Sequence, residues 1–267
     1  MSVEAEKLRP SSSIAGDVWH KDAEPQAYEW WYFDATSADG RDVLVVIFLS
    51  NFLFSPRYNR AAAESLRHPS PAAASAERFP ALAFSFYRDG RPLFRAINEY
   101  GQGDFQANTS WPECRIGDSS FRLVEAGPET LYELNIRATL RGSRSLQAHL
   151  QWRMKEGDFS GDEVGATATD KSVHHWNMVA PRCDVSGRIE LLGTNGERSF
   201  EQDFRGTGYH DHNRDARWMP ATIAGWQWGR FHFPAATAVF YSYREHGQLR
   251  PVTHLQLIQD GELSVLT

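Results

Sequence analysis

The chain has 267 residues, of which 41% are hydrophobic, so it can form a core in one large domain or in two smaller ones. Its formal net charge of −6 and the lack of a basic run argue against nucleic acid as a partner, because phosphate binding needs a basic surface. Phe, Trp and Tyr together make up 13% of the residues, which favours β-strands and apolar pockets.

Nothing in the sequence indicates a membrane protein or a secreted one. The N-terminus lacks a charged-then-apolar leader, and the longest apolar run, 43–50, is too short to span a bilayer. We therefore expect a soluble, cytoplasmic protein. Cys114 and Cys183 fit no metal-binding spacing and are expected to be buried small residues.

The first part of the chain changes from polar to aromatic. Residues 1–24 are polar and predict a poorly ordered lead-in. Alternation in the strand 28–34 puts Trp and Phe or Tyr side chains on both faces, which predicts a strand between a core and a second apolar surface, such as an aromatic-lined cavity. In that strand we expect Glu29 and Asp34 to anchor backbone or Arg groups. The run 43–49 returns after a turn at 38–41 as the second half of a hairpin.

Short strands then follow one another for the rest of the chain. The segment 60–80 predicts a surface loop with a short helical piece, and 157–170 predicts a long loop. No segment has a sustained helical period, so we expect an all-β sandwich or barrel. The expected strands are 81–87, 93–99, 105–110, 114–116, 121–125, 131–140, 146–154, 175–180, 183–192, 200–210, 223–233, 236–243 and 252–259.

The sequence predicts two domains of unequal size. A charged link at 214–220 places the boundary near 205–220, which gives a first β domain at 25–210 and the start of a second at 211–267. Only three or four strands follow the boundary, too few to close a barrel. The second unit is therefore expected to be partial or shortened, unless its strands close onto the first set.

One stretch, 203–213, has the composition of a reactive site. It holds two Asp, two His, a Tyr and an Asn, and a Gly-x-Gly hinge introduces the last part of it. On a strand, Tyr209, Asp211 and Asn213 share one face, while His210 and His212 share the other. A chemical role is one interpretation, since buried titratable groups each need a partner. The other is a polar strand end whose side chains bind their neighbours.

Several motifs resemble those of the hydroxyneurosporene synthase family, which comprises acyclic carotenoid hydratases and their AttH-like relatives. The motifs follow the family order and are YEWWYFD at 28–34, SPRY at 55–58, HHWN at 174–177, GTGYHDHN at 206–213 and WQWGR at 226–230. This resemblance implies tandem lipocalin-like β-barrels, one complete and one partial in this chain, that hold a lipophilic substrate between or inside them. It further implies His174, Trp176, Tyr209 and Asp211 as the catalytic residues.

Hydration of an isoprenoid double bond explains why these residue types would be needed. Protonation of the alkene requires a carboxylic acid that an apolar pocket keeps protonated, and Asp211 oriented by Tyr209 can supply it. Aromatic faces such as those of Trp176 or Trp30 can stabilise the carbocation, and His174 can hold the attacking water. The aromatic residues expected to contact the substrate are Trp30, Trp31, Tyr32 and Trp228.

Other functions remain open at this point. The same pocket without a placed water gives a terpenoid cyclase or a Diels-Alderase-like pericyclase, and a non-catalytic lipocalin-like carrier would also use an aromatic cavity. His210 and His212 could bind a metal together with His175 or His232, but no credible third ligand lies nearby in the sequence. We therefore expect neither metal nor cofactor, and at most a peripheral membrane contact for substrate uptake.

Overall fold

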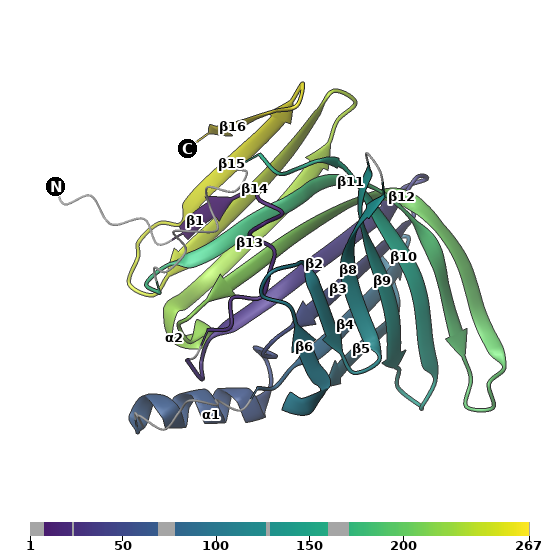
Figure 1. Cartoon of the computed structure of the whole chain (residues 1–267), viewed down its shortest axis with the longest axis horizontal. Helices are drawn as coiled ribbons and strands as arrows, with labels where there is room; N and C mark the ends of the chain where they lie inside the picture. Colours follow the sequence, from purple (N-terminus) through teal and green to yellow (C-terminus); the bar gives the residue numbers. More distant parts are fainter. Residues whose placement is uncertain (1–7, 23, 69–77, 127–128, 160–170, 267) are drawn as a thin grey trace.

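The computed structural model describes residues 8–22, 24–68, 78–126, 129–159 and 171–266, and most of them lie in β-strands (Figure 1). The predicted all-β class is confirmed. The strands are β1 (Leu8–Ser11), β2 (Tyr28–Ser37), β3 (Asp42–Leu49), β4 (Ala81–Arg88), β5 (Arg91–Glu99), β6 (Phe105–Ala107), β7 (Glu113–Ile116), β8 (Ser119–Ala126), β9 (Glu129–Thr139), β10 (Ser145–Glu156), β11 (His174–Leu192), β12 (Arg198–Asp215), β13 (Ile223–His232), β14 (Ala236–Glu245), β15 (Val252–Gln259) and β16 (Glu262–Leu266). The helices are α1 (Pro56–Arg67), α2 (Met219–Thr222) and the 3₁₀ turn η1 (Gln102–Asp104).

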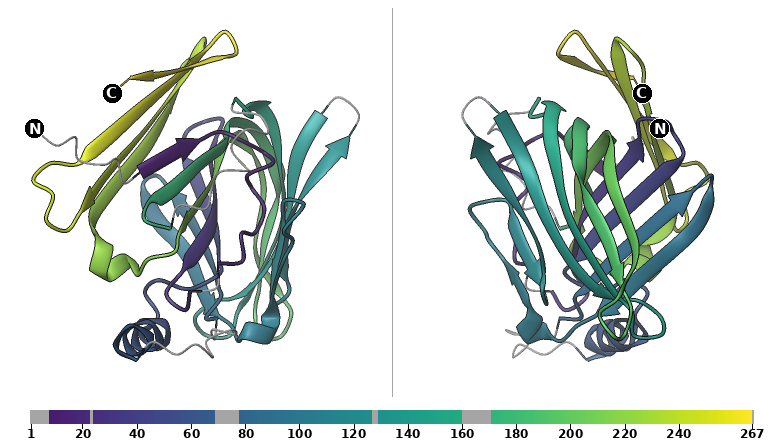
Figure 2. Two further views of the ribbon diagram at one scale, coloured as in Figure 1. Left: turned by 60° about the vertical axis from the view of Figure 1, so that its left-hand side comes forward. Right: turned by 90° about the vertical axis from the view of Figure 1, so that its right-hand side faces the viewer.

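Twelve strands form one large sheet that curls into a half-barrel (Figure 2). Its order is β5-β4-β3-β2-β12-β11-β10-β9-β8-β7-β6, and β1 pairs in parallel with β11. Several of the antiparallel connections are short; the β4–β5 turn, for example, has Asp89 and Gly90 at φ 51° and 72°, the backbone of a type I′ hairpin. β2 and β12 lie side by side in the middle of the sheet, as their two-sided apolar content predicts.

Four further strands, β13-β14-β15-β16, form a second sheet that lies over one face of the first (Figure 1). The break between the sheets falls after β12, which ends at Asp215, and before β13, which begins at Ile223. The division into domains at 25–210 and 211–267 stays a prediction. Among the described residues, no helix is long and apolar enough to cross a membrane.

Both faces of the central strands are buried, each in its own core. The first core lies inside the curl of the large sheet and includes Trp31, Phe33, Phe121 and Trp152; we call this side the core face. The second lies between the large sheet and β13–β16, and its residues include Trp30, Trp176, Tyr209 and Tyr241; we call this side the cavity face. Two cores explain why β2 has no polar face.

The N-terminal segment differs from the expected lead-in. From Leu8 onward the described part is ordered, and Ser12, Ser13 and Asp17 are fully buried. The Ser12 hydroxyl donates to the carbonyl of Met178 at 2.7 Å, and Ser13 N–H donates to the Asn177 side chain at 2.9 Å. Polar composition suggested disorder here because it did not reveal that these groups find partners on distant strands, Ser12 and Ser13 on β11 and Asp17 on β9 and β12.

Smaller differences concern boundaries. Helix α1 begins at Pro56, before the expected loop, because Ser55 caps it by accepting from the N–H groups of Arg57 and Tyr58. β11 is a single strand through 181–182, and β12 continues past His210 to Asp215. Residues 60–67 of the expected loop at 60–80 belong to α1, which is the short helical piece predicted there. Residues 69–77 and most of the expected loop at 157–170 lie outside the described residues. Gly206 and Gly208 are not a hinge, since both lie within β12.

Candidate active site

The stretch 209–213 lies in the buried end of β12, where the strand alternation predicted from the sequence holds. Tyr209, Asp211 and Asn213 point to the cavity face, opposite Asp34, Tyr32 and Trp30 of β2 in the antiparallel register. Trp176 of β11 pairs with Asn213 from the other side. Because directly paired residues share a face of a sheet, three adjacent strands bring these side chains together.

Asp211 is the centre of a hydrogen-bonded group. Its Oδ2 accepts from the Tyr209 hydroxyl at 2.8 Å and from Trp176 Nε1 at 3.1 Å, and its Oδ1 accepts from Asn213 Nδ2 at 2.9 Å. The residue is only 3% exposed. Three donors fix the orientation of the carboxyl, and they come from both β11 and β12.

Burial decides the protonation state of this carboxyl. Desolvation raises the pKa of Asp211 from 3.8 to about 7, against the opposing effect of the hydrogen bonds from Tyr209 and Trp176 and of the charge of His210. A carboxylic acid in an apolar site is therefore available as a proton donor near neutral pH. Burial likewise raises the pKa of Tyr209 well above 10, so the phenol stays a donor.

An apolar cavity of about 170 Å³ lies beside the carboxyl, between the large sheet and β13–β14. Asp211 is the single acidic residue among the described residues that line it. The full lining is Trp30, Tyr32, Ile47, Leu49, Leu53, Phe54, Asp211, Asn213, Trp226, Trp228 and Tyr241.

His174 lies behind this cavity and does not line it. Its Nε2 is 3.2 Å from Asn213 Oδ1 and 3.0 Å from the Tyr241 hydroxyl, and its Nδ1 is 3.7 Å from Asp215 Oδ2. The expectation that His174 itself contacts a water in the cavity is therefore not supported. His174 thus contacts two polar residues of the cavity lining, Asn213 and Tyr241.

Three of the four aromatic residues expected to contact a substrate line the cavity, and one does not. Trp30, Tyr32 and Trp228 are in the lining, with the ring of Trp228 stacked on Tyr209 at 5.2 Å. Trp31 points to the core face, where it stacks on His212 at 4.6 Å and donates to the carbonyl of Asp17. Strand alternation separates Trp31 from its two neighbours, so its assignment as a substrate contact is wrong for this cavity.

The two acidic residues of β2 have the structural roles expected of them. Asp34 accepts from Arg230 Nε at 2.7 Å, and Glu29 accepts from the backbone N–H of His20 at 3.0 Å. Cys114 and Cys183 are buried free thiols, also as expected.

Residues that the sequence did not assign complete the site. Asn213 shares the strand face of Asp211, so alternation alone could have indicated it. Tyr241 and Trp226 come from β14 and β13, whose placement over β2 and β12 depends on sheet packing. No local signal in the sequence carries that information.

Comparison with known proteins identifies the family. A family model described as carotenoid hydratase CrtC matches residues 99–267, more than half of the chain. A curated relative from Chlorobaculum tepidum, named hydroxyneurosporene dehydrogenase, is 28% identical over 225 residues, which are 84% of this chain and 58% of the relative. The chain therefore spans little more than half the length of that relative.

A solved structure supports the fold. The crystal structure of a protein assigned as AttH from Nitrosomonas europaea is similar with a TM-score of 0.62 and 14% identity, over 96% of this chain and 72% of that chain. At this identity the likeness shows a common lipocalin-like β architecture and nothing of the chemistry. With the match to the family model, we conclude that the chain belongs to the carotenoid hydratase CrtC family.

Proposed function

We propose that this protein adds water to a C=C bond at the end of an acyclic carotenoid or a related polyene, with Asp211 as the acid. The observation that carries this proposal is the buried carboxyl of Asp211 in an otherwise apolar, aromatic cavity. The family and the name of the Chlorobaculum tepidum relative, hydroxyneurosporene dehydrogenase, support a carotenoid as substrate.

The first step transfers a proton from Asp211 to the alkene. Because Asp211 Oδ2 already accepts two hydrogen bonds and Oδ1 only one, Oδ1 has the free capacity to carry the proton. The C=C bond takes this proton and becomes a tertiary carbocation, and Asp211 becomes a carboxylate. The rings of Trp30 and Trp228 in the cavity lining can stabilise the cation with their negative faces.

The second step needs one water beside the cation. Asn213 and Tyr241 bring polar groups to the cavity lining, and His174 Nε2 lies 3.0 Å from the Tyr241 hydroxyl. We assign Tyr241 and Asn213 to water binding and His174 to their orientation. The water oxygen bonds to the carbon, and the proton it releases returns to Asp211, so the acid is regenerated without a cofactor.

The size of the cavity indicates which part of a polyene enters it. Sites that enclose a drug-sized ligand measure roughly 300–1,000 Å³. The volume here is about 170 Å³, which suits one end of an isoprenoid chain while the rest lies outside the cavity. We therefore expect hydration at a terminal double bond.

The test is turnover of an acyclic carotenoid such as neurosporene in water labelled with heavy oxygen. The wild-type protein should incorporate one labelled oxygen, and Asp211→Asn should lower kcat/KM by about 10²–10⁴-fold or more while the fold persists. Tyr209→Phe should lower kcat/KM by a smaller factor, because it removes a hydroxyl that orients Asp211 and not the proton that Asp211 donates. Asp203→Asn is the matched control, since Asp203 lies on the same strand with a side chain 79% exposed.

Other outcomes identify other functions. Turnover by Asp211→Asn at the wild-type rate would refute Asp211 as the acid. Loss of turnover in Trp30→Ala with only a mild effect of Asp211→Asn, and no labelled oxygen in the product, would indicate a pericyclase or cyclase. If the wild-type protein and Asp211→Asn bind the polyene equally and neither forms a product, the protein is a carrier.

A further inference from the structure

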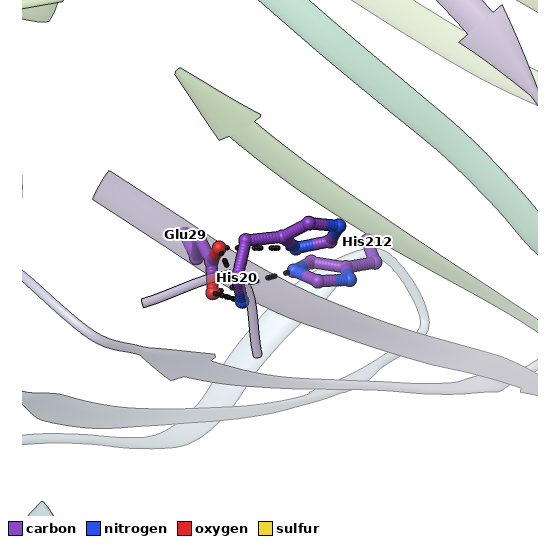
Figure 3. Close-up of side chains that lie close together, drawn as sticks. All are labelled: His20, Glu29 and His212. Atoms are coloured by element: carbon purple, nitrogen blue, oxygen red, sulfur yellow. Dashed lines mark hydrogen bonds and ion pairs between the residues drawn. The ribbon is translucent and has the colours of Figure 1, made fainter. Parts of the chain in front are cut away.

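A second group of ionisable side chains lies on the core face of β12, opposite Asp211. His212 of β12, Glu29 of β2 and His20 of the N-terminal segment meet there (Figure 3). One nitrogen or carboxylate oxygen from each of the three lies within 4.8 Å of the other two. The sequence suggested two histidines without a third ligand; the structure corrects this, because His20 and Glu29 are brought in by the fold and His210 takes no part.

His212 presents an unused nitrogen to this group. Its Nδ1 is 3.3 Å from Asp17 Oδ1, a partner that favours the proton on Nδ1 and leaves a lone pair on Nε2. Nε2 has no hydrogen-bond partner, although the side chain is only 1% exposed, and it faces Glu29 Oε2 at 3.9 Å. A buried polar atom without a partner is unfavourable unless something else binds it.

The other two groups are held in place toward the same point. Glu29 Oε1 is 3.1 Å from His20 Nδ1, and the Glu29 side chain is 3% exposed. His212 is further fixed by stacking of its ring on Trp31 at 4.6 Å. Asp17 itself is anchored by the Tyr132 hydroxyl at 2.7 Å and by His210 Nε2 at 3.0 Å.

We propose that His20, Glu29 and His212 bind a divalent transition-metal ion such as Zn²⁺. Two imidazole nitrogens and one carboxylate are a donor set that Zn²⁺ takes in proteins, at ligand distances of about 2.0–2.2 Å. Asp17 acts as the outer partner that orients His212, the arrangement common around metal-bound histidine.

Such an ion would tie three separate parts of the chain together. His20 belongs to the N-terminal segment, whereas Glu29 and His212 lie on neighbouring strands of the sheet. The ion would fasten this segment across the core face. The ion would lie on the face of β12 opposite to Asp211, so it would take no part in the proposed proton transfer. This proposal is therefore independent of the proposed hydratase activity.

The test uses the full chain, stripped of metal with a chelator and titrated with Zn²⁺ alone by calorimetry. We expect one equivalent to bind, and Co²⁺ as a spectroscopic substitute should give the visible absorption of a low-coordinate site. His20→Ala and Glu29→Gln should each weaken binding at least about tenfold, and Asp17→Asn should weaken it by about 10–100-fold through His212. The wild-type Tm should rise with Zn²⁺, and that of Glu29→Gln should not.

The variants are chosen to keep the fold. The His20 side chain is 20% exposed and lies outside the strands, and Gln at position 29 can still accept from the N–H of His20. His149→Ala is the matched control, because His149 is an exposed histidine on β10 whose Nδ1 contacts Asn135. Absence of a one-to-one complex, or affinity within twofold of wild type in either His20→Ala or Glu29→Gln, overturns the proposal.

Discussion

At the scale of the residue, two opposing effects act on the pKa of the Asp211 carboxyl. Burial raises the pKa of Asp211 to about 7, while the donors Tyr209 and Trp176 oppose the rise. The hydrogen bonds therefore orient the acid without making it a permanent carboxylate, because the apolar cavity outweighs them. Asn213, which the sequence placed on the same face, adds the third donor.

The raised pKa predicts how activity depends on pH. Only the protonated carboxyl can donate to an alkene, so kcat/KM should be highest on the acid side of about 7 and fall above it, by about tenfold per pH unit. Tyr209 on the same strand and Tyr241 on β14 stay protonated there, since burial raises the pKa of both well above 10. Asp34 on β2 adds a small repulsion in the same direction as burial.

The measurement is a pH profile of kcat/KM on chelator-treated protein, so that the profile reports the carboxyl without any bound ion. Asp203→Asn should give the wild-type profile. A rate that rises through pH 7 would mean that the ionised form acts, as a base would, and would contradict the assignment of Asp211 as an acid.

At the scale of the element, β12 determines the site because it packs closely against β2 on one side and β11 on the other. A Cβ at Gly208 would lie 2.5 Å from Trp152 Nε1 and 2.7 Å from the carbonyl oxygen of Asp34. These two atoms form a hydrogen bond of 3.1 Å next to the site. The Gly-x-Gly pattern thus serves close approach of neighbouring groups.

We predict that Gly208→Ala destabilises the protein by about 1–3 kcal/mol, as overpacking of a core does, and lowers turnover by displacing Asp34 and its neighbour Tyr209. Gly225→Ala is the matched control, because Gly225 also lies in a strand but a Cβ there would meet no other atom within 4 Å. Urea denaturation followed by circular dichroism measures both. Equal stability of the two variants would show that β12 has room to adjust.

How far the sequence predicts these elements depends on whether the signal is local. Alternation correctly separated Tyr209 and Asp211 from His210 and His212, and it gave β2 two apolar faces, because a strand's period of two is a local property. The N-terminal segment was misjudged, since Ser12 and Asp17 find their partners more than a hundred residues away. Tyr241 contributes to the cavity beside Asp211, and Glu29 contributes to the group with His20 and His212. Both contributions likewise depend on contacts between residues far apart in the sequence.

At the scale of the whole molecule, the cavity exists only because the two sheets are held together. Trp226 and Trp228 on β13 and Tyr241 on β14 form the side that faces β2 and β12. Arg230 of β13 joins the sheets, with Nε 2.7 Å from Asp34 Oδ1 and Nη2 bonded to the carbonyl of Thr207. The side chains of Arg230 and Asp34 are only 12% and 8% exposed.

We predict that Arg230→Ala lowers both stability and turnover. Removing one partner of a buried ion pair leaves the other charge unpaired and costs about 3–5 kcal/mol of stability. Because the side chains of Arg230 and Asp34 keep a little exposure, we expect a loss near the lower end of this range. Loosening β13 also displaces Trp228 from the cavity. Arg244→Ala on β14, an exposed arginine of the second sheet, is the matched control and should have little effect.

The double variant Asp34→Asn with Arg230→Ala separates the ion pair from the rest of the interface. If the loss in Arg230→Ala comes mainly from the stranded carboxylate, the double variant should recover part of the stability, and the coupling should appear in a double-mutant cycle measured by denaturation. Turnover should recover less than stability, because the cavity still lacks the contact that holds β13 against β2. Additive losses with no coupling would show that other contacts, such as Arg182 with the carbonyl of Phe233, hold the second sheet in place.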